Sequence, residues 1–249
     1  MSRAVGRITA LLELLSSQGQ PLGLSDIATA TGLDKSTTYR FLRACESEQI
    51  VRRDPVTRRY SLGIRIIDWG GRALNSIDVV NAAEPILEHL NKQTQETIGL
   101  YVRQSQWRCV VAVRRSPRMT VVSLRVGWIA PLPLGAPGKV FLAFMDECEV
   151  ADVFEAHPQI DAALRQRIES ELPRIRQLGF ATSQHEISPH AWSVAAPIFG
   201  PATEPIASIA ISTPTSRYSL EAERKFIEQI VEAREEITRR MGGGCRWAV

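Results

Sequence analysis

The sequence predicts an α+β protein of two domains joined by a linker helix, and three observations support this prediction. At 249 residues the chain is longer than one typical domain. Its N-terminal part shows helical periodicity around a glycine turn and then a short hairpin, the pattern of a winged helix-turn-helix. The remainder contains strands separated by short turns with helices gathered elsewhere, which favours an antiparallel sheet. We place the winged helix at residues 1–63, the linker helix at 64–77 and the second domain at 78–249.

The N-terminal domain is organised around residues 24–47, which we interpret as two short helices joined by a tight turn. Ser25 is the expected N-cap of the first helix, and Gly32 is expected to end it in a left-handed conformation. Asp34 is placed to cap the second helix. An earlier helix completes a three-helix core with apolar positions Val5, Ile8, Leu11, Leu12 and Leu15.

The second of these helices has two contrasting faces. Its apolar side carries Thr38, Phe41, Leu42 and Cys45 at helical spacing. The opposite side offers short donors, one aromatic ring and long cations, a combination that suits the major groove of DNA. Together with Ser25 and two arginines of the hairpin turn, these residues form the predicted DNA-binding set: Ser25, Lys35, Ser36, Thr37, Tyr39, Arg40, Arg43, Arg58 and Arg59. The alternative is an ordinary helical pair whose surface cations only face solvent.

Residues 50–63 are predicted to form the hairpin, or wing, with four arginines in or beside its turn. Arginines at such a turn can pair with phosphates, which positions a protein on DNA without reading sequence. The charge distribution agrees, because residues 1–76 carry 11 Lys/Arg against 7 Asp/Glu, whereas the remainder carries 19 against 20.

Stretches in both predicted domains resemble a known family. The run GLDKSTTYRFL at 32–42 and the later YSLG at 60–63 are similar to the DNA-binding domain of IclR-type transcriptional regulators. Three later stretches resemble the effector-binding domain of the same family: LPLGAPGK at 132–139, LGFA at 178–181 and SVAAPI at 193–198. The resemblance covers nearly the whole chain and implies a second domain of the GAF type, which holds a small ligand between its sheet and a short helix.

In the second domain we expect an amphipathic helix beginning near Asp78, in which Pro85 is tolerable only near the start. Strands are expected at 98–103, 107–114, 120–126, 180–187, 192–199 and 206–212. Residues 127–133 are expected to be a loop, with helices at 138–144, 161–178 and 218–241. Pro173 falls inside one of these helices as a candidate kink. The C-terminal GGGCRWAV is expected to fray.

The linker segment carries an apolar stripe that its own small domain does not obviously cover: Ile64, Ile67, Gly71 and Leu74. Gly70 and Gly71 weaken this helix by roughly 1 kcal/mol each relative to alanine. The stripe predicts a homodimer through this linker, which matches a palindromic operator in double-stranded DNA, and a dimer of dimers would form through the second domains. The resemblance implies the same, since family members use this region for dimer contacts.

The resemblance also implies the ligand-binding residues, which fall on Gly135, Ala136, Pro137, Ser183, Ala191, Ser193, Ala210 and Ser212. The chain departs from the family pattern where His190 or Ala191 replaces a usual glycine and where Ser183 replaces an acidic residue. Backbone N–H groups ahead of the Gly138 helix, with the hydroxyls of Ser193 and Ser212, could hold a carboxylate.

The predicted ligand is a small organic acid with an apolar or aromatic body. No arginine falls at the mapped positions, and Lys139 is free to point away from them. Trp128 or Trp192 could supply an aromatic wall, and each is equally compatible with a core or interface position.

The sequence leaves two alternatives to a ligand-responsive regulator. One is a DNA-binding protein whose second domain only oligomerises. The other is a small-ester hydrolase built on Ser183, His185, Ser188, His190 and Ser193, which lacks the G-x-S-x-G elbow. The scattered cysteines predict reduced thiols and no zinc site. No cofactor, other metal or membrane partner is expected, and the cytoplasm is the expected location.

Overall fold

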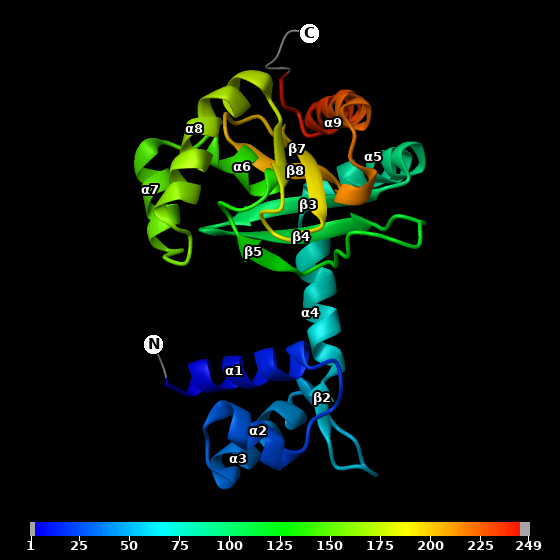
Figure 1. Cartoon of the computed structure of the whole chain (residues 1–249). Coiled ribbons are helices and arrows are strands. Elements are labelled where there is room, and N and C mark those ends of the chain that lie inside the picture. The colour runs from blue at the N-terminus through cyan, green and yellow to red at the C-terminus, as the bar shows by residue number, and fades with distance from the viewer. Residues whose placement is uncertain (1–2, 245–249) are drawn as a thin grey trace. The chain divides into compact units, whose positions relative to one another are not determined.

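The computed structural model describes residues 3–244, which form two compact units that divide between Ser76 and Ile77 (Figure 1). The expected fraying falls largely on residues 245–249, which lie outside the described residues. Among the helices of the described chain, none combines the length and apolar character needed to cross a membrane.

The first unit is a winged helix-turn-helix. Its elements are α1 (Arg3–Ser17), α2 (Leu24–Thr31), α3 (Lys35–Ser47), β1 (Val51–Arg53), β2 (Tyr60–Leu62) and α4 (Ile64–Asn75). Strands β1 and β2 pair antiparallel, and Leu22 adds an antiparallel bridge to Tyr60. The small core joins α1, α2 and α3 to the hairpin through Leu11, Leu15, Ile27, Leu42, Cys45, Val51 and Tyr60.

The ends of α2 and α3 are fixed by local hydrogen bonds and one glycine. Gly32 ends α2 with a φ of 66°, and the Asp34 carboxylate accepts the Thr37 N–H at 2.8 Å, as the sequence predicts. Ser25, in contrast, is not the N-cap. The cap is Gly23, whose N–H donates to the Asp26 carboxylate at 3.2 Å, so Ser25 lies one residue inside the helix.

The second unit is built on a six-stranded antiparallel sheet. The strands are β3 (Thr97–Gln104), β4 (Trp107–Arg114), β5 (Ile129–Pro131), β6 (Ala181–Gln184), β7 (Ala191–Phe199) and β8 (Pro205–Pro214). Their order is β5-β4-β3-β8-β7-β6, so β3 and β8 lie at the centre. The helices are α5 (Asp78–Thr94), α6 (Ala136–Leu142), α7 (Glu147–Glu155), α8 (Ala162–Leu178), α9 (Leu220–Arg240) and the short 3-10 turn η1 (Thr215–Arg217).

The helices of this unit cover the two faces of the sheet separately (Figure 1). Helix α9 packs on β7 and against α5, whereas α6 packs on β7 and β8 and is covered by α8. Small residues allow α6 to approach the sheet, because Ala181, Ala195 and Ala210 are cross-strand neighbours and all belong to the core beneath it. The unit is therefore an α+β domain with a layered antiparallel sheet.

Several expected element boundaries in the second unit are wrong. Residues 120–126 form no strand, and the strand β5 instead lies inside the stretch expected to be a loop at 127–133. The edge of β4 is already taken by β5 and by the Trp128 carbonyl, which accepts the Val110 N–H, so the preceding residues run past the sheet without joining it. Helix α7 was not predicted, and α5 continues through Pro85.

Candidate DNA-binding face and ligand cavity

The exposed side of α3 carries the residues that the sequence singles out for DNA. Lys35, Ser36, Tyr39, Arg40 and Arg43 are exposed and Thr37 is half-buried. The reverse side is held in the core by buried Thr38, Leu42 and Cys45, with Phe41 half-buried. Because the core fixes the helix, its polar side is presented to solvent as one continuous face.

The cations of this face differ in how they are engaged. Arg43 forms an exposed ion pair with Glu46 at 3.2 Å. Within residues 3–244, Arg40 has neither an ion pair nor a side-chain hydrogen bond. Its guanidinium is thus unengaged, whereas one nitrogen of the Arg43 guanidinium is held by Glu46.

The wing turn is held by Asp54, whose carboxylate accepts the N–H groups of Val56 and Thr57 and the Thr57 hydroxyl. Hydrogen bonds from Thr57 hold the pKa of the Asp54 carboxyl below its usual value. Arg58 and Arg59 lie exposed on this turn, Arg58 with a φ of 58°. One guanidinium nitrogen of Arg59, Nη1, donates to the Pro21 carbonyl at 3.1 Å, beside the strand bridge.

In the second unit the three serines of the predicted ligand set form a row across neighbouring strands. Ser183 pairs with Ser193 across β6 and β7, and Ser193 pairs with Ser212 across β7 and β8. Directly opposite residues of antiparallel strands share a face. The row continues to Thr97 on β3, so hydroxyl groups cross four strands of the sheet.

The three serines of this hydroxyl row border a cavity of about 330 Å³. Six of the eight predicted ligand residues line it: Gly135, Pro137, Ser183, Ala191, Ser193 and Ser212. Its apolar walls include Leu124, Trp128 and Ile187. Ala136 and Ala210 do not line the cavity. Both are fully buried in the core between α6 and the sheet, Ala136 on α6 and Ala210 on β8, because α6 approaches the sheet closely.

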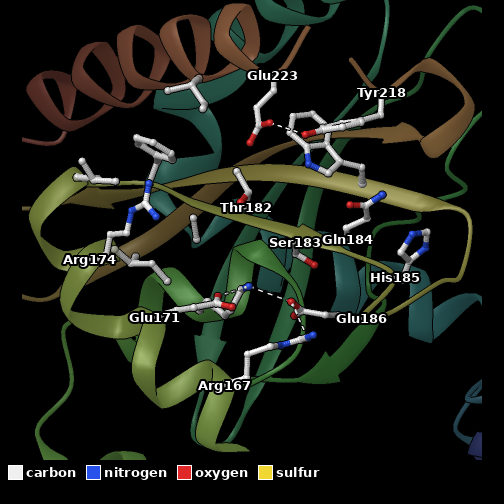
Figure 2. Close-up of a pocket in the computed structure, with 17 residues that line it drawn as sticks. Arg167, Glu171, Arg174, Thr182, Ser183, Gln184, His185, Glu186, Tyr218 and Glu223 are labelled. Carbon is white, nitrogen blue, oxygen red and sulfur yellow. Dashed lines mark hydrogen bonds and ion pairs between the residues drawn. The ribbon is translucent and has the colours of Figure 1, made fainter. Parts of the chain in front are cut away.

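The backbone donor expected to hold a ligand carboxylate is already occupied. The Gly135 N–H donates to the Glu186 carboxylate at 2.8 Å. The same carboxylate accepts from Lys139 at 2.9 Å, and Lys139 also pairs with Glu171 at 2.7 Å (Figure 2). Lys139 is therefore buried inside an ionic network, and the expected cradle at this end of α6 is satisfied by the protein itself.

A second hollow, of about 660 Å³, lies beside β6 and α8 (Figure 2). Arg167, Glu171 and Glu186 gather at one end of it, and Tyr218 and Glu223 at the other. Tyr218 donates to Glu223 at 2.7 Å, and Arg167 lies 3.5 Å from Glu186. Ser183 and Glu186 border both hollows. Most charges of this larger hollow are thus paired within the protein.

The sequence reasoning missed Arg108, which lines the smaller cavity from β4. Only 2 % of Arg108 is exposed, and its Nη1 donates to the Pro131 carbonyl at 2.6 Å. Burial lowers the pKa of Arg108 to about 10, partly offset by Tyr101 and Glu186. A signal was present, because Arg108 shares strand parity with Val110 and therefore points to the same covered face.

The residues of the alternative ester hydrolase are not assembled for catalysis. The His185 ring forms a hydrogen bond with the Pro189 carbonyl at 2.5 Å, and both His185 and His190 are exposed. In the portion of the chain that is described, no cluster of three His, Cys, Asp or Glu side chains is arranged to hold a metal ion.

A donor-rich helix on a winged helix-turn-helix, together with an antiparallel-sheet domain that encloses a cavity, defines the class of two-domain transcriptional regulators. The family description "IclR helix-turn-helix domain" matches residues 4–55, and "Bacterial transcriptional regulator IclR C-terminal" matches residues 71–239. The chain belongs to the IclR family of DNA-binding transcriptional regulators.

Individual relatives agree with this membership. The HTH-type transcriptional regulator XynR of Escherichia coli K12 is 26 % identical over 96 % of this chain and 97 % of its own. A crystallised IclR regulator from Alicyclobacillus acidocaldarius has a TM-score of 0.81 at 27 % identity, covering 98 % of this chain and all of its own. An IclR homolog of Microbacterium hydrocarbonoxydans, complexed with 4-hydroxybenzoate, shares the fold at 18 % identity, with a TM-score of 0.82 over 96 % of this chain and 98 % of its own. The relatives are transcriptional regulators and not enzymes.

Proposed function

We propose that this regulator binds a palindromic operator as a homodimer or a dimer of dimers, and that a small organic acid in the second unit modulates its operator affinity. The 330 Å³ cavity beside the hydroxyl row is the observation that carries the ligand part of this proposal. Its volume lies at the lower end of the ~300–1,000 Å³ typical of small-molecule sites, so a single-ring body suits it.

The DNA part of the proposal assigns base contacts to α3 and phosphate contacts to the wing. Arg40 carries the discriminating role because its guanidinium is exposed and unengaged within the described chain. Arg58 and Arg59, on a turn separate from α3, supply phosphate contacts that position the domain. Ser25, Lys35, Ser36, Thr37, Tyr39 and Arg43 complete the proposed contact set.

The ligand part draws support from the chemistry of the cavity and from one structural neighbour. Ser183, Ser193 and Ser212 offer hydroxyls, and Leu124, Trp128 and Ile187 offer apolar surface. The neighbour from Microbacterium hydrocarbonoxydans, similar in fold only, is complexed with an aromatic hydroxy acid. An acid with an apolar or aromatic body therefore fits better than a very small acid.

The test begins with thermal unfolding of the whole protein against a library of organic acids. A ligand that binds the native state raises the unfolding midpoint. Each hit is then added to an operator-binding assay, in which it should change operator affinity. The double variant Ser193→Leu with Ser212→Val, which removes two hydroxyls and fills space, should lose both responses.

Thr182→Val is the matched control, because Thr182 lies on β6 beside Ser183 but does not line the 330 Å³ cavity. A double variant that still responds to the ligand with unchanged affinity would remove the ligand from this cavity. If no acid shifts the unfolding midpoint while DNA binding is intact, the second unit serves only to oligomerise.

A further inference from the structure

Arg108 carries a charge that no ion pair neutralises in the described part of the chain. Within residues 3–244, no Asp or Glu forms an ion pair with its guanidinium, and its Nε has no hydrogen-bond partner. Its bonds are to neutral groups, the Pro131 carbonyl at 2.6 Å and, at 3.5 Å, the Leu132 carbonyl. The guanidinium carbon also lies 5.9 Å from the centroid of the Tyr101 ring, and the Glu186 carboxylate attracts the charge without forming an ion pair with it.

A cation buried without a counter-charge is unfavourable, because it gives up hydration without gaining an equivalent attraction. Buried charges in native proteins are normally paired for this reason. Hydrogen bonding to two backbone carbonyls does not require a permanent charge. The burial of Arg108 is therefore unexplained by the contacts that it makes within its own domain.

The other charged groups near the cavity are already paired. Glu186 accepts from Gly135 and Lys139, and Lys139 is shared between Glu186 and Glu171. Among the charged groups that the structure describes around this cavity, Arg108 is the one without an ion-pair partner. One uncompensated positive charge calls for one negative charge from outside the protein.

The free side of the guanidinium lies where a ligand can reach it. Nη1 is turned toward Pro131 and Leu132, whereas a Cβ placed on Gly135, a residue that lines the cavity, would meet Nη2 at 3.2 Å. Tyr101 and Ser212 border the same space and interact through their hydroxyls. Hydroxyl donors thus stand beside the unpaired cation, as an anion requires.

We propose that Arg108 binds the carboxylate of a singly charged effector, whose apolar body lies against Leu124 and Trp128, and that it selects acids over neutral molecules of the same shape. This inference rests on the proposed function and specifies the chemistry of that same cavity. The ligand carboxylate then binds Arg108 on β4 and not the backbone at the start of α6, where the Gly135 N–H already donates to Glu186. Arg108 is then the residue that determines specificity for charge.

The experiment uses matched pairs of acids and their amides on the full-length protein: benzoate with benzamide, phenylacetate with phenylacetamide, and hexanoate with hexanamide. Thermal unfolding is measured for the wild type, Arg108→Gln and Arg108→Lys. In the wild type, at least one acid should raise the unfolding midpoint and its amide should not. Arg108→Gln should abolish this difference, and Arg108→Lys should restore part of it because lysine keeps the charge.

Arg103→Gln is the matched control. Arg103 lies on β3, pairs with Glu149 at 3.1 Å and does not line the cavity, so its loss should leave the difference between acid and amide intact. Chloride and inorganic phosphate are tested alongside, since stabilisation by these ions alone would mean a simple anion site. Stabilisation by chloride or phosphate alone would overturn the proposal. So would equal stabilisation by an acid and its amide, or the absence of stabilisation by any of the acids.

The proposed function can fail separately. If an acid stabilises the wild type through Arg108 but leaves operator affinity unchanged, the carboxylate site stands and the coupling to DNA fails. If an acid changes operator affinity equally in the wild type and in Arg108→Gln, the regulation stands and Arg108 is not its anchor.

Discussion

Arg40 is the side chain whose role in DNA recognition can be separated most cleanly from that of its neighbours. We predict that Arg40→Ala weakens binding to the specific operator more than binding to random DNA, because a base contact is worth roughly 1–3 kcal/mol of discrimination. Arg58→Ala and Arg59→Ala in the wing should weaken both kinds of binding alike and reduce the salt dependence. Binding titrations at several salt concentrations measure these differences.

Arg7→Ala serves as the control for net charge, because Arg7 is an exposed arginine on α1, outside the predicted DNA-binding set. It should leave the ratio of specific to non-specific affinity unchanged. Equal losses on all DNA sequences for Arg40→Ala would make Arg40 a phosphate contact.

Single residues of the N-terminal unit were predictable where the chemistry is local. The roles of Gly32 and Asp34 follow from glycine's tolerance of positive φ and from a carboxylate three residues before an amide. Ser25 was misplaced as a cap because Gly23 and Asp26 complete the same hydrogen bonding two residues earlier. Arg108 escaped notice because its significance depends on missing partners, which only the folded chain reveals.

The approach of α6 to the β5 segment depends on one glycine. A Cβ at Gly138 would overlap the Leu132 carbonyl and lie 2.8 Å from Arg108 Nη1. We predict that Gly138→Ala lowers the stability of the second unit by about 1–3 kcal/mol or more, the usual range for overpacking. The same variant should displace Arg108 and so reduce any stabilisation by acids. Chemical denaturation with and without ligand measures both effects.

Gly200→Ala is the comparison variant within the same unit. A Cβ at Gly200 would touch Ile206 no closer than 3.4 Å, an ordinary contact. The two variants should therefore differ strongly in stability. Similar stabilities would show that α6 can shift away from Leu132 at little expense.

Among the secondary-structure elements, those with strong periodicity were predictable and those fixed by pairing were not. Helices α8 and α9 follow from apolar spacing and capping residues, which are local in sequence. Residues 120–126 are rich in valine and resemble a strand, but the β4 edge is filled by β5 and the backbone at Gly127 and Trp128. Which segment pairs with a free strand edge depends on the tertiary fold, and the strand propensity of one segment alone does not predict it.

The apolar stripe of α4 bears on the assembly of the protein. None of the residues of α4 is buried within its own unit, and Ile64 and Ile67 are 65 % and 70 % exposed. In the described structure, a Cβ at Gly70 or Gly71 would also meet nothing within 4 Å. Large exposed apolar side chains beside small residues are typical of a surface that a partner helix covers.

We predict that Ile64→Asp with Ile67→Asp converts a dimer into a monomer and weakens operator binding, since two half-sites are then no longer bound together. Sedimentation velocity and operator titration measure the two effects. Ala73→Asp adds one negative charge on the opposite side of α4 and should change neither. A wild-type protein that sediments as a monomer with intact operator affinity would contradict this assembly.

The uncompensated charge of Arg108 also has a consequence for how long each molecule survives. Proteases act mainly on opened chains, and their access follows the population of the open form. A ligand that supplies the missing charge stabilises the closed domain by about 2.7 kcal/mol when present at ~100 times its Kd, which reduces the opened fraction roughly 100-fold. Pulse-chase measurements with and without a stabilising acid would detect the difference in turnover, and equal half-lives would refute it. The metabolite would then govern the abundance of its own receptor as well as its affinity for DNA.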